Sequence, residues 1–121
     1  MLDRLTWAFG SSFVAASVAQ GAVIAHGLNK FEPNLHEQQK LRVSLDAAKN
    51  MTMLNGLGMC LIALRGRTGL AAVPAGLLLT GNILFPGILW YELHTKDKQF
   101  HSFIKFGGMS TIVGWFTMAL L

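Results

Sequence analysis

The fold is decided by one apolar stretch, residues 70–93, which reads LAAVPAGLLLTGNILFPGILWYEL. Glu92 is the single charged residue in it. A helix over this stretch would be about 36 Å long at 1.5 Å per residue, enough to cross a hydrocarbon core of about 30 Å. The pair Trp90 and Tyr91 near its end is typical of the aromatic belt at a membrane surface. The stretch therefore predicts a transmembrane helix.

This predicted helix contains two prolines. Pro74 lies in the first turn, where a missing N–H costs little. Pro86 lies deep inside, removes the backbone hydrogen bond to the carbonyl of Asn82, and predicts a helix kink.

Three further apolar runs flank the deciding stretch, and short polar turns separate them. Charged residues make up 13% of the chain, about half the share usual in soluble domains, and spans one, three and four lack the charged stripe of a soluble bundle. Because the turns are short, consecutive helices should run antiparallel. We predict an all-α integral membrane bundle, up-down-up-down, with one domain over residues 1–121 and spans at about 5–28, 47–64, 70–93 and 101–121. We expect the first span to be retained, because its apolar run is longer than a signal-peptide core.

A helical extension is predicted before span two. Asn34 can cap a helix and Glu37 can complete a capping box, and residues 37–50 are amphipathic. We interpret this segment as a helix at the membrane surface that continues into span two. A solvated helix without partners is an equally good interpretation.

The Lys and Arg count predicts the orientation of the bundle. The first and third loops share one side with seven cations, and the termini and middle loop share the other side with three. The positive-inside rule places the first and third loops in the matrix or cytoplasm. The richer side holds Lys30, Lys40, Arg42, Lys49, Lys96, Lys98 and Lys105, and the other Arg4, Arg65 and Arg67.

Small residues recur along the predicted spans, in part at intervals of four, which lets helix backbones approach closely in lipid. We expect them to mediate helix packing rather than to form a specialised site. They are Gly21, Ala25, Gly56, Gly87, Gly107, Gly108 and Gly114.

Polar residues within or at the ends of the spans form the candidate site. In the predicted topology the ionisable ones converge on the Lys-rich side of the membrane. One interpretation is a proton relay, a metal site, or contacts to a quinone or lipid headgroup. The other is a set of interfacial side chains solvated by water and headgroups, with the amides hydrogen-bonded between helices. The candidate polar face comprises Gln20, His26, Asn55, Glu92, His94 and His101.

Catalytic patterns are absent from the sequence. There is no Gly-rich phosphate loop, no His pair at i and i+4, and no nucleophile with an evident base. Cys60 is the single cysteine, which excludes an internal disulfide and a multi-cysteine metal site. We expect no catalytic residue, metal or cofactor, and neither nucleic acid nor a soluble substrate as partner.

Three segments resemble the small membrane proteins of the transmembrane protein 256 type, which include bacterial YgdD-like proteins. They are the Gly-Ala-Val-Ile-Ala-His-Gly run at 21–27, the Leu-Phe-Pro-Gly-Ile-Leu-Trp-Tyr run at 84–91, and Gly107-Gly108 followed by Gly114-Trp115. The resemblance covers nearly the whole chain and implies four spans. It also implies a mitochondrial location, because eukaryotic members are associated with mitochondria, and it carries no established activity.

One departure from that family concerns span two. Where the family usually has a His, this chain has Asn55, followed by Gly56 and Leu57. The resemblance would have paired His26 with a second intramembrane His, so the pair cannot form here. This favours packing over chemistry.

Two functional hypotheses follow from these observations. The leading one is a non-catalytic accessory or structural subunit of a larger mitochondrial inner-membrane assembly, such as a respiratory-chain complex, with membrane lipids and other membrane subunits as partners. The alternative is a small membrane module that binds or transports a quinone, lipid or ion through the polar face near His26 and Glu92. A bacterial plasma membrane is the alternative location.

Overall fold

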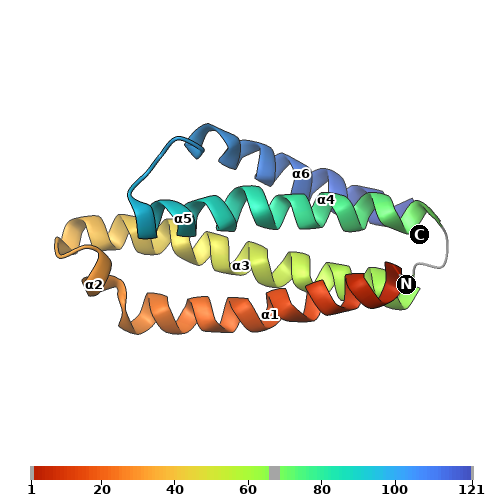
Figure 1. Cartoon of the computed structure of the whole chain (residues 1–121), viewed down its shortest axis with the longest axis horizontal. Helices are drawn as coiled ribbons and strands as arrows, with labels where there is room; N and C mark the ends of the chain where they lie inside the picture. Colours follow the sequence, from red (N-terminus) through yellow and green to blue (C-terminus); the bar gives the residue numbers. More distant parts are fainter. Residues whose placement is uncertain (1, 66–68, 121) are drawn as a thin grey trace.

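The computed structural model describes residues 2–65 and 69–120, and their regular structure is entirely helical. The described residues form four antiparallel rods that alternate in direction along the chain (Figure 1). The all-α class predicted from the sequence is confirmed. The predicted turn at 66–68 lies outside the described residues. The elements are α1 Leu2–His26, α2 Leu28–Phe31, α3 Leu35–Arg65, η1 Gly69–Ala71, α4 Ala72–Asn82, η2 Ile83–Gly87, α5 Ile88–Thr95, η3 His101–Phe103, α6 Ile104–Thr117 and η4 Met118–Leu120.

The predicted helical extension and span two form one continuous helix, α3. Asn34 caps it, because its Oδ1 accepts hydrogen bonds from the N–H groups of His36 at 2.9 Å and Glu37 at 3.3 Å. The extension belongs to the bundle, because Leu45 is fully buried against Ile24 of α1 and Leu28 of α2. The apolar stripe of the extension therefore packs on protein.

The third rod is a composite of η1, α4, η2 and α5. The disturbance predicted at Pro86 takes the form of a π-helical turn, η2, with Pro86 buried inside it. A wider turn accommodates a residue that has no N–H to donate, and π-helical turns are a known site of helix irregularity.

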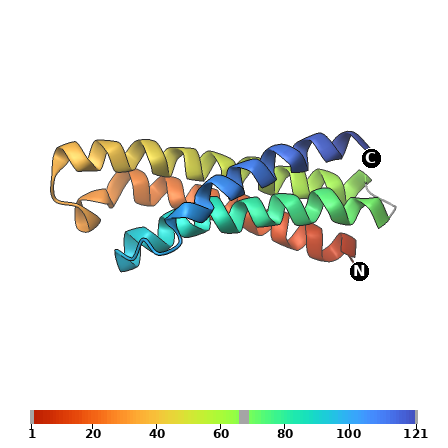
Figure 2. The ribbon, with the colours of Figure 1, turned by 90° about the horizontal axis from the view of Figure 1, so that it is seen from above.

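The four rods are arranged as an open row rather than a closed square. α1 packs on α3, α3 also packs on α4, and α4 packs on α6 (Figure 1). Seen from above, α6 crosses α4 obliquely (Figure 2). α1 and α6 are therefore edge helices, each with one principal neighbour.

Glycines mark the closest helix crossings. A Cβ added to Gly10 would lie 2.6 Å from the carbonyl oxygen of Gly56, and one added to Gly56 would lie 2.7 Å from that of Gly10. On α6, a Cβ at Gly107 would lie 2.7 Å from the backbone nitrogen of Phe85 in η2. At these points only glycine lets the backbones touch without displacement.

Two helical segments of the described chain are long and apolar enough to cross a membrane, Asp3–His26 and Gly69–Thr95, with mean hydropathies of 1.5 and 1.7. These two segments are candidate membrane spans. α3 and α6 do not meet the same criteria of length and apolar composition, although much of their outer surface is apolar.

Candidate functional site

A polar seam runs through the interior of the bundle, formed by Gln20, Thr52, Asn55, Asn82, Thr111 and Trp115. Its centre is Asn55, which is completely buried. The Asn55 Nδ2 group donates to the Thr111 hydroxyl at 2.9 Å and to the Leu78 carbonyl at 3.4 Å, and its Oδ1 accepts from the indole N–H of Trp115 at 3.2 Å. Asn55 thus links α3 to α4 and α6.

The other half of the seam is organised by Thr52. Its hydroxyl donates to the Ala48 carbonyl at 2.8 Å and accepts from the amide Nε2 of Gln20 at 3.3 Å. The Thr52 carbonyl accepts from Nδ2 of Asn82 at 3.5 Å. These contacts fix both amide orientations and leave Gln20 Oε1 and Asn82 Oδ1 buried with no protein donor among the described residues.

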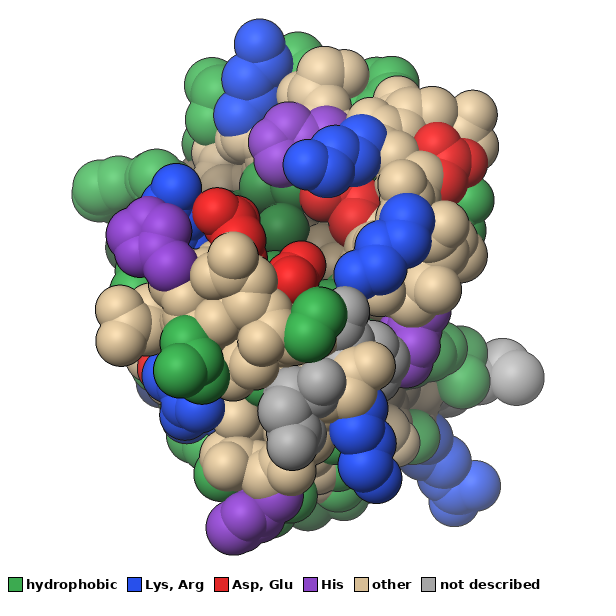
Figure 3. Space-filling model, turned by 90° about the vertical axis from the view of Figure 1, so that its left-hand side faces the viewer, with side chains coloured by type: hydrophobic (Ala, Val, Ile, Leu, Met, Phe, Trp, Pro, Cys, Tyr) green, Lys and Arg blue, Asp and Glu red, His purple; other side chains and the backbone are tan. Residues whose placement is uncertain are grey.

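Charged and histidine side chains gather at the end of the bundle away from the chain termini (Figure 3). There the imidazole Nδ1 of His101 lies 2.9 and 3.2 Å from the two carboxylate oxygens of Glu92. The Glu92 side chain is only 10% exposed, whereas that of His101 is 63% exposed. The Glu92 carboxylate has further acceptor positions, so this pair can bind a cationic group.

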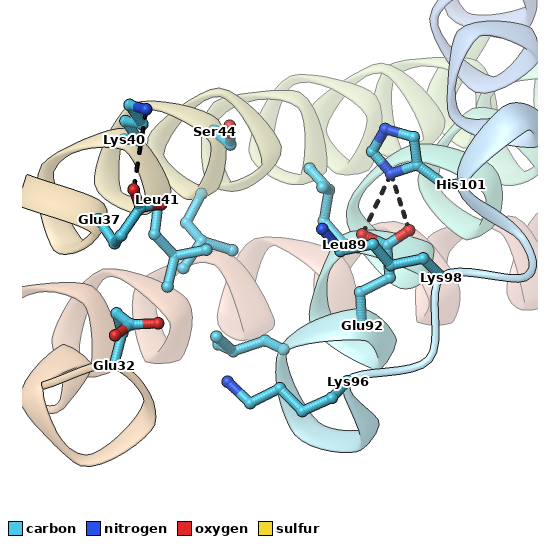
Figure 4. A pocket seen from close by; sticks show the side chains of 12 residues that line it. Glu32, Glu37, Lys40, Leu41, Ser44, Leu89, Glu92, Lys96, Lys98 and His101 are labelled. Carbon is cyan, nitrogen blue, oxygen red and sulfur yellow. Dashed lines mark hydrogen bonds and ion pairs between the residues drawn. The ribbon is translucent and has the colours of Figure 1, made fainter. Parts of the chain in front are cut away.

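Beside this pair lies a cavity of about 400 Å³, which we call the end cavity (Figure 4). It opens between the first part of α3 and the end of α5. Its lining combines leucines with groups of both charge signs: Glu32, Glu37, Lys40, Leu41, Ser44, Leu45, Leu89, Glu92, Leu93, Lys96, Lys98 and His101.

The candidate polar face predicted from the sequence separates into four places. Gln20 and Asn55 belong to the polar seam, and Glu92 and His101 belong to the end cavity. His26 joins neither: it is exposed and lines a separate cavity of about 450 Å³ with Ala22, Val23, Gly27 and Lys30. His94 is also exposed, with its ring 6.4 Å from that of Trp90.

The predicted packing residues also divide into two groups. Gly56, Gly107 and Gly114 lie where an added Cβ would meet another helix at 2.9 Å or less. Gly21 meets only the Lys49 stem at 3.4 Å, Gly87 only the Asn82 carbonyl oxygen at 3.4 Å, and Gly108 nothing within 4 Å, and Ala25 is exposed. These four positions therefore do not form close backbone crossings within the described chain.

Sequence reasoning missed Thr52, Thr111 and Trp115. A signal was available, because Thr52 stands three residues before Asn55, and Trp115 stands four after Thr111. Such spacings place each pair on one helix face. Within residues 2–65 and 69–120, no group of three or more His, Cys, Asp or Glu side chains could hold a metal ion.

Fold and site together define a small all-helical protein with two candidate membrane spans, a polar interior seam and a charged end. The family model described as "Protein of unknown function (DUF423)" matches residues 20–108, so the chain belongs to this uncharacterised family. No solved structure matches the chain.

Proposed function

We propose that this chain is a four-span membrane bundle and a non-catalytic accessory subunit of a larger assembly in the mitochondrial inner membrane, such as a respiratory-chain complex. The observation that carries the proposal is the open row of helices with an apolar outer surface. Only 17% of the most apolar window of Asp3–His26 is buried within the chain, against 39% for Gly69–Thr95.

The apolar outer surface extends over the two helices that do not qualify as spans alone. On the second half of α3, Leu54, Leu57, Leu61 and Leu64 are between 46% and 69% exposed. On α6, Phe106, Met109, Ile112, Val113 and Phe116 are exposed. A soluble monomer rarely leaves so large an apolar surface to water, so lipid and neighbouring helices are its natural surroundings.

The interior polar groups support a packing role. The side chain of Asn55 directs its amide and carbonyl groups at neighbouring helices, so they hold the bundle together. The resemblance to the transmembrane protein 256 type supports the mitochondrial inner membrane as the location. The Lys and Arg count supports the matrix side for the loops around residues 29–34 and 95–100.

The test is the behaviour of the full-length chain in native membranes. We expect it to resist carbonate extraction and to migrate, after solubilisation in mild detergent, with a larger assembly on a native gel. Migration only as a lone small species would contradict the accessory-subunit role.

A bulky apolar substitution on an edge helix distinguishes contact with a partner helix from contact with lipid. Val18 on α1 is 64% exposed. Val18→Trp stays compatible with lipid but blocks a closely packed partner helix, and Ile112→Trp does the same on α6. We expect at least one of them to release the chain from the assembly while membrane retention is unchanged.

A second candidate function is binding of a quinone, lipid or ion at the polar end of the bundle. The end cavity favours it, with Glu92 rather than His26 as the central group. Under this function Glu92→Gln should reduce ligand binding and His26→Ala should not. If His26→Ala reduced ligand binding and Glu92→Gln did not, the ligand would bind at the surface of α1 beside His26.

A further inference from the structure

The end cavity is amphiphilic. Its apolar lining consists of Leu41 and Leu45 from α3 and Leu89 and Leu93 from α5. Leu45 and Leu93 belong to the buried core at this end of the bundle, with Leu41 and Leu89 packed against it. A ligand in this cavity would therefore contact leucine side chains that are held in place by the fold.

The rim of the cavity carries both signs of charge in nearly equal number. Carboxylates come from Glu32, Glu37 and Glu92, and ammonium groups from Lys40, Lys96 and Lys98. Glu37 and Lys40 already form an exposed pair at 3.8 Å. The remaining groups come from three different segments, so they surround the opening (Figure 4). Such a rim suits a ligand that itself carries one positive and one negative charge.

Glu92 is the anionic group best placed to recognise a cation. Its side chain is nine-tenths buried and borders the cavity. His101 contacts both carboxylate oxygens through a single ring nitrogen, which leaves acceptor positions on each oxygen. A primary ammonium group has three N–H donors and can use these positions.

Lys96 is the cationic group with the most unusual backbone. It adopts the left-handed conformation at φ 60° and ψ 14°, and its N–H donates to the Glu92 carbonyl at 2.8 Å at the end of α5. Among the described non-glycine residues it alone has a positive φ. Glycine is the usual residue for this position, so a lysine occupies it at a conformational cost. In Figure 4 its ammonium group extends toward the side of the cavity where Glu32 lies.

We propose that the end cavity binds a phospholipid whose headgroup carries a primary ammonium, as phosphoethanolamine does. Glu92 accepts hydrogen bonds from the ammonium, Lys96 and Lys98 bind the phosphate, and the leucines contact the glycerol and the start of the acyl chains. Phe, Tyr and Trp, whose rings recognise quaternary ammonium groups, are absent from the described residues that line the cavity. The site thus favours ethanolamine over choline headgroups. This inference rests on the membrane location in the proposed function.

The experiment is native mass spectrometry of the full-length chain, purified in detergent and mixed with phospholipids of identical acyl chains. Ethanolamine, choline and glycerol headgroups are compared. We expect the ethanolamine lipid to be retained about tenfold more than the other two, the effect of one charge-assisted hydrogen-bonded contact.

Four variants separate recognition from folding. Glu92→Gln should reduce ethanolamine-lipid retention to the level of the choline lipid. Lys98→Gln, at an exposed position, should weaken binding of all three phospholipids. Asp46→Asn and Lys30→Gln make the same charge changes outside the cavity lining and should bind like the parent chain.

Lys96→Gly tests the left-handed lysine. Glycine removes the ammonium group and is the usual residue for a left-handed backbone, so phospholipid binding should fall. Phospholipid binding as tight as that of the parent chain would contradict this role of Lys96.

Two outcomes would overturn the lipid site while the membrane function stands. One is equal retention of the ethanolamine and choline lipids by a chain that resists carbonate extraction. The other is binding of soluble phosphoethanolamine as tight as that of the lipid, because the leucine surface would then contribute nothing. Release of the chain by carbonate would overturn the proposed membrane function, and the lipid site with it.

Discussion

At the scale of single residues, Asn55 does the most to hold different helices together. It is fully buried and contacts Leu78 on α4 and Thr111 and Trp115 on α6. A hydrogen bond between membrane helices contributes about 0.6 kcal/mol on average, and an unpaired buried donor costs more. The residue is therefore a structural junction, which fits a chain that packs with its neighbours.

We predict that Asn55→Ala destabilises the bundle by about 2 kcal/mol, because three interhelical contacts are lost and the Trp115 indole N–H loses its acceptor. Unfolding of the purified chain by SDS in mixed micelles measures this. Asn50→Ala is the matched control, since Asn50 is exposed on the same helix and should change stability by less than about 0.5 kcal/mol. Equal losses of stability in Asn55→Ala and Asn50→Ala would contradict the role of Asn55 in holding the helices together.

At the scale of elements, α6 depends on the irregular turn in the third rod. Gly107 sits against the backbone of η2, where an added Cβ would lie 2.7 Å from the Phe85 nitrogen and 2.9 Å from the Leu84 carbonyl carbon. The π-helical turn η2, which contains Pro86, is thus the part of the third rod against which Gly107 of α6 packs.

Two adjacent glycines give a sharp test of this contact. Gly107→Ala should cost about 1–3 kcal/mol, because a methyl group would be forced against backbone. Gly108→Ala meets nothing within 4 Å and should leave stability unchanged or raise it by up to about 1 kcal/mol through helix propensity. Thermal unfolding in detergent compares the stabilities of the two variants. A larger loss of stability in Gly108→Ala than in Gly107→Ala would show that α6 is rotated about its axis relative to the structure.

The sequence predicts local features of these elements better than contacts between them. The Asn34 cap and the irregularity around Pro86 depend on neighbouring residues, so both could be predicted. The contacts of Asn55 could not, because its partners lie 23 to 60 residues away along the chain. His26 lines a separate cavity, and the sequence could not show this for the same reason: the side to which an end-of-helix residue points depends on how α1 is rotated against α3.

At the scale of the whole molecule, both charged loops lie at one end of the row and both chain termini at the other (Figure 1). The sequence predicted this antiparallel order from short turns alone. It could not predict the open row, because that depends on the Gly10–Gly56 and Gly107–Phe85 contacts, which set which helices lie side by side. An open row leaves the outer faces of α1 and α6 uncovered by the rest of the described chain.

The orientation of the row gives a further prediction. In a Cys60→Ala background, Gln39→Cys and Lys98→Cys should react with an impermeant maleimide from the matrix or cytoplasmic side, and Arg4→Cys from the opposite side. The excess of lysines at the loop end is the reason. Sealed vesicles of known sidedness measure this, and labelling of Gln39→Cys and Lys98→Cys from opposite sides would contradict the antiparallel row.

In the proposed four-span bundle α3 and α6 cross the membrane together with the two candidate spans, and the accessibility of single cysteines measures this crossing. Leu54 and Ile112 are 55% and 58% exposed, on α3 and α6. In the Cys60→Ala background and intact vesicles, we predict that Leu54→Cys and Ile112→Cys resist an impermeant maleimide from both sides, while Lys98→Cys reacts. Reaction of Leu54→Cys and Ile112→Cys at the rate of Lys98→Cys would contradict the four-span bundle.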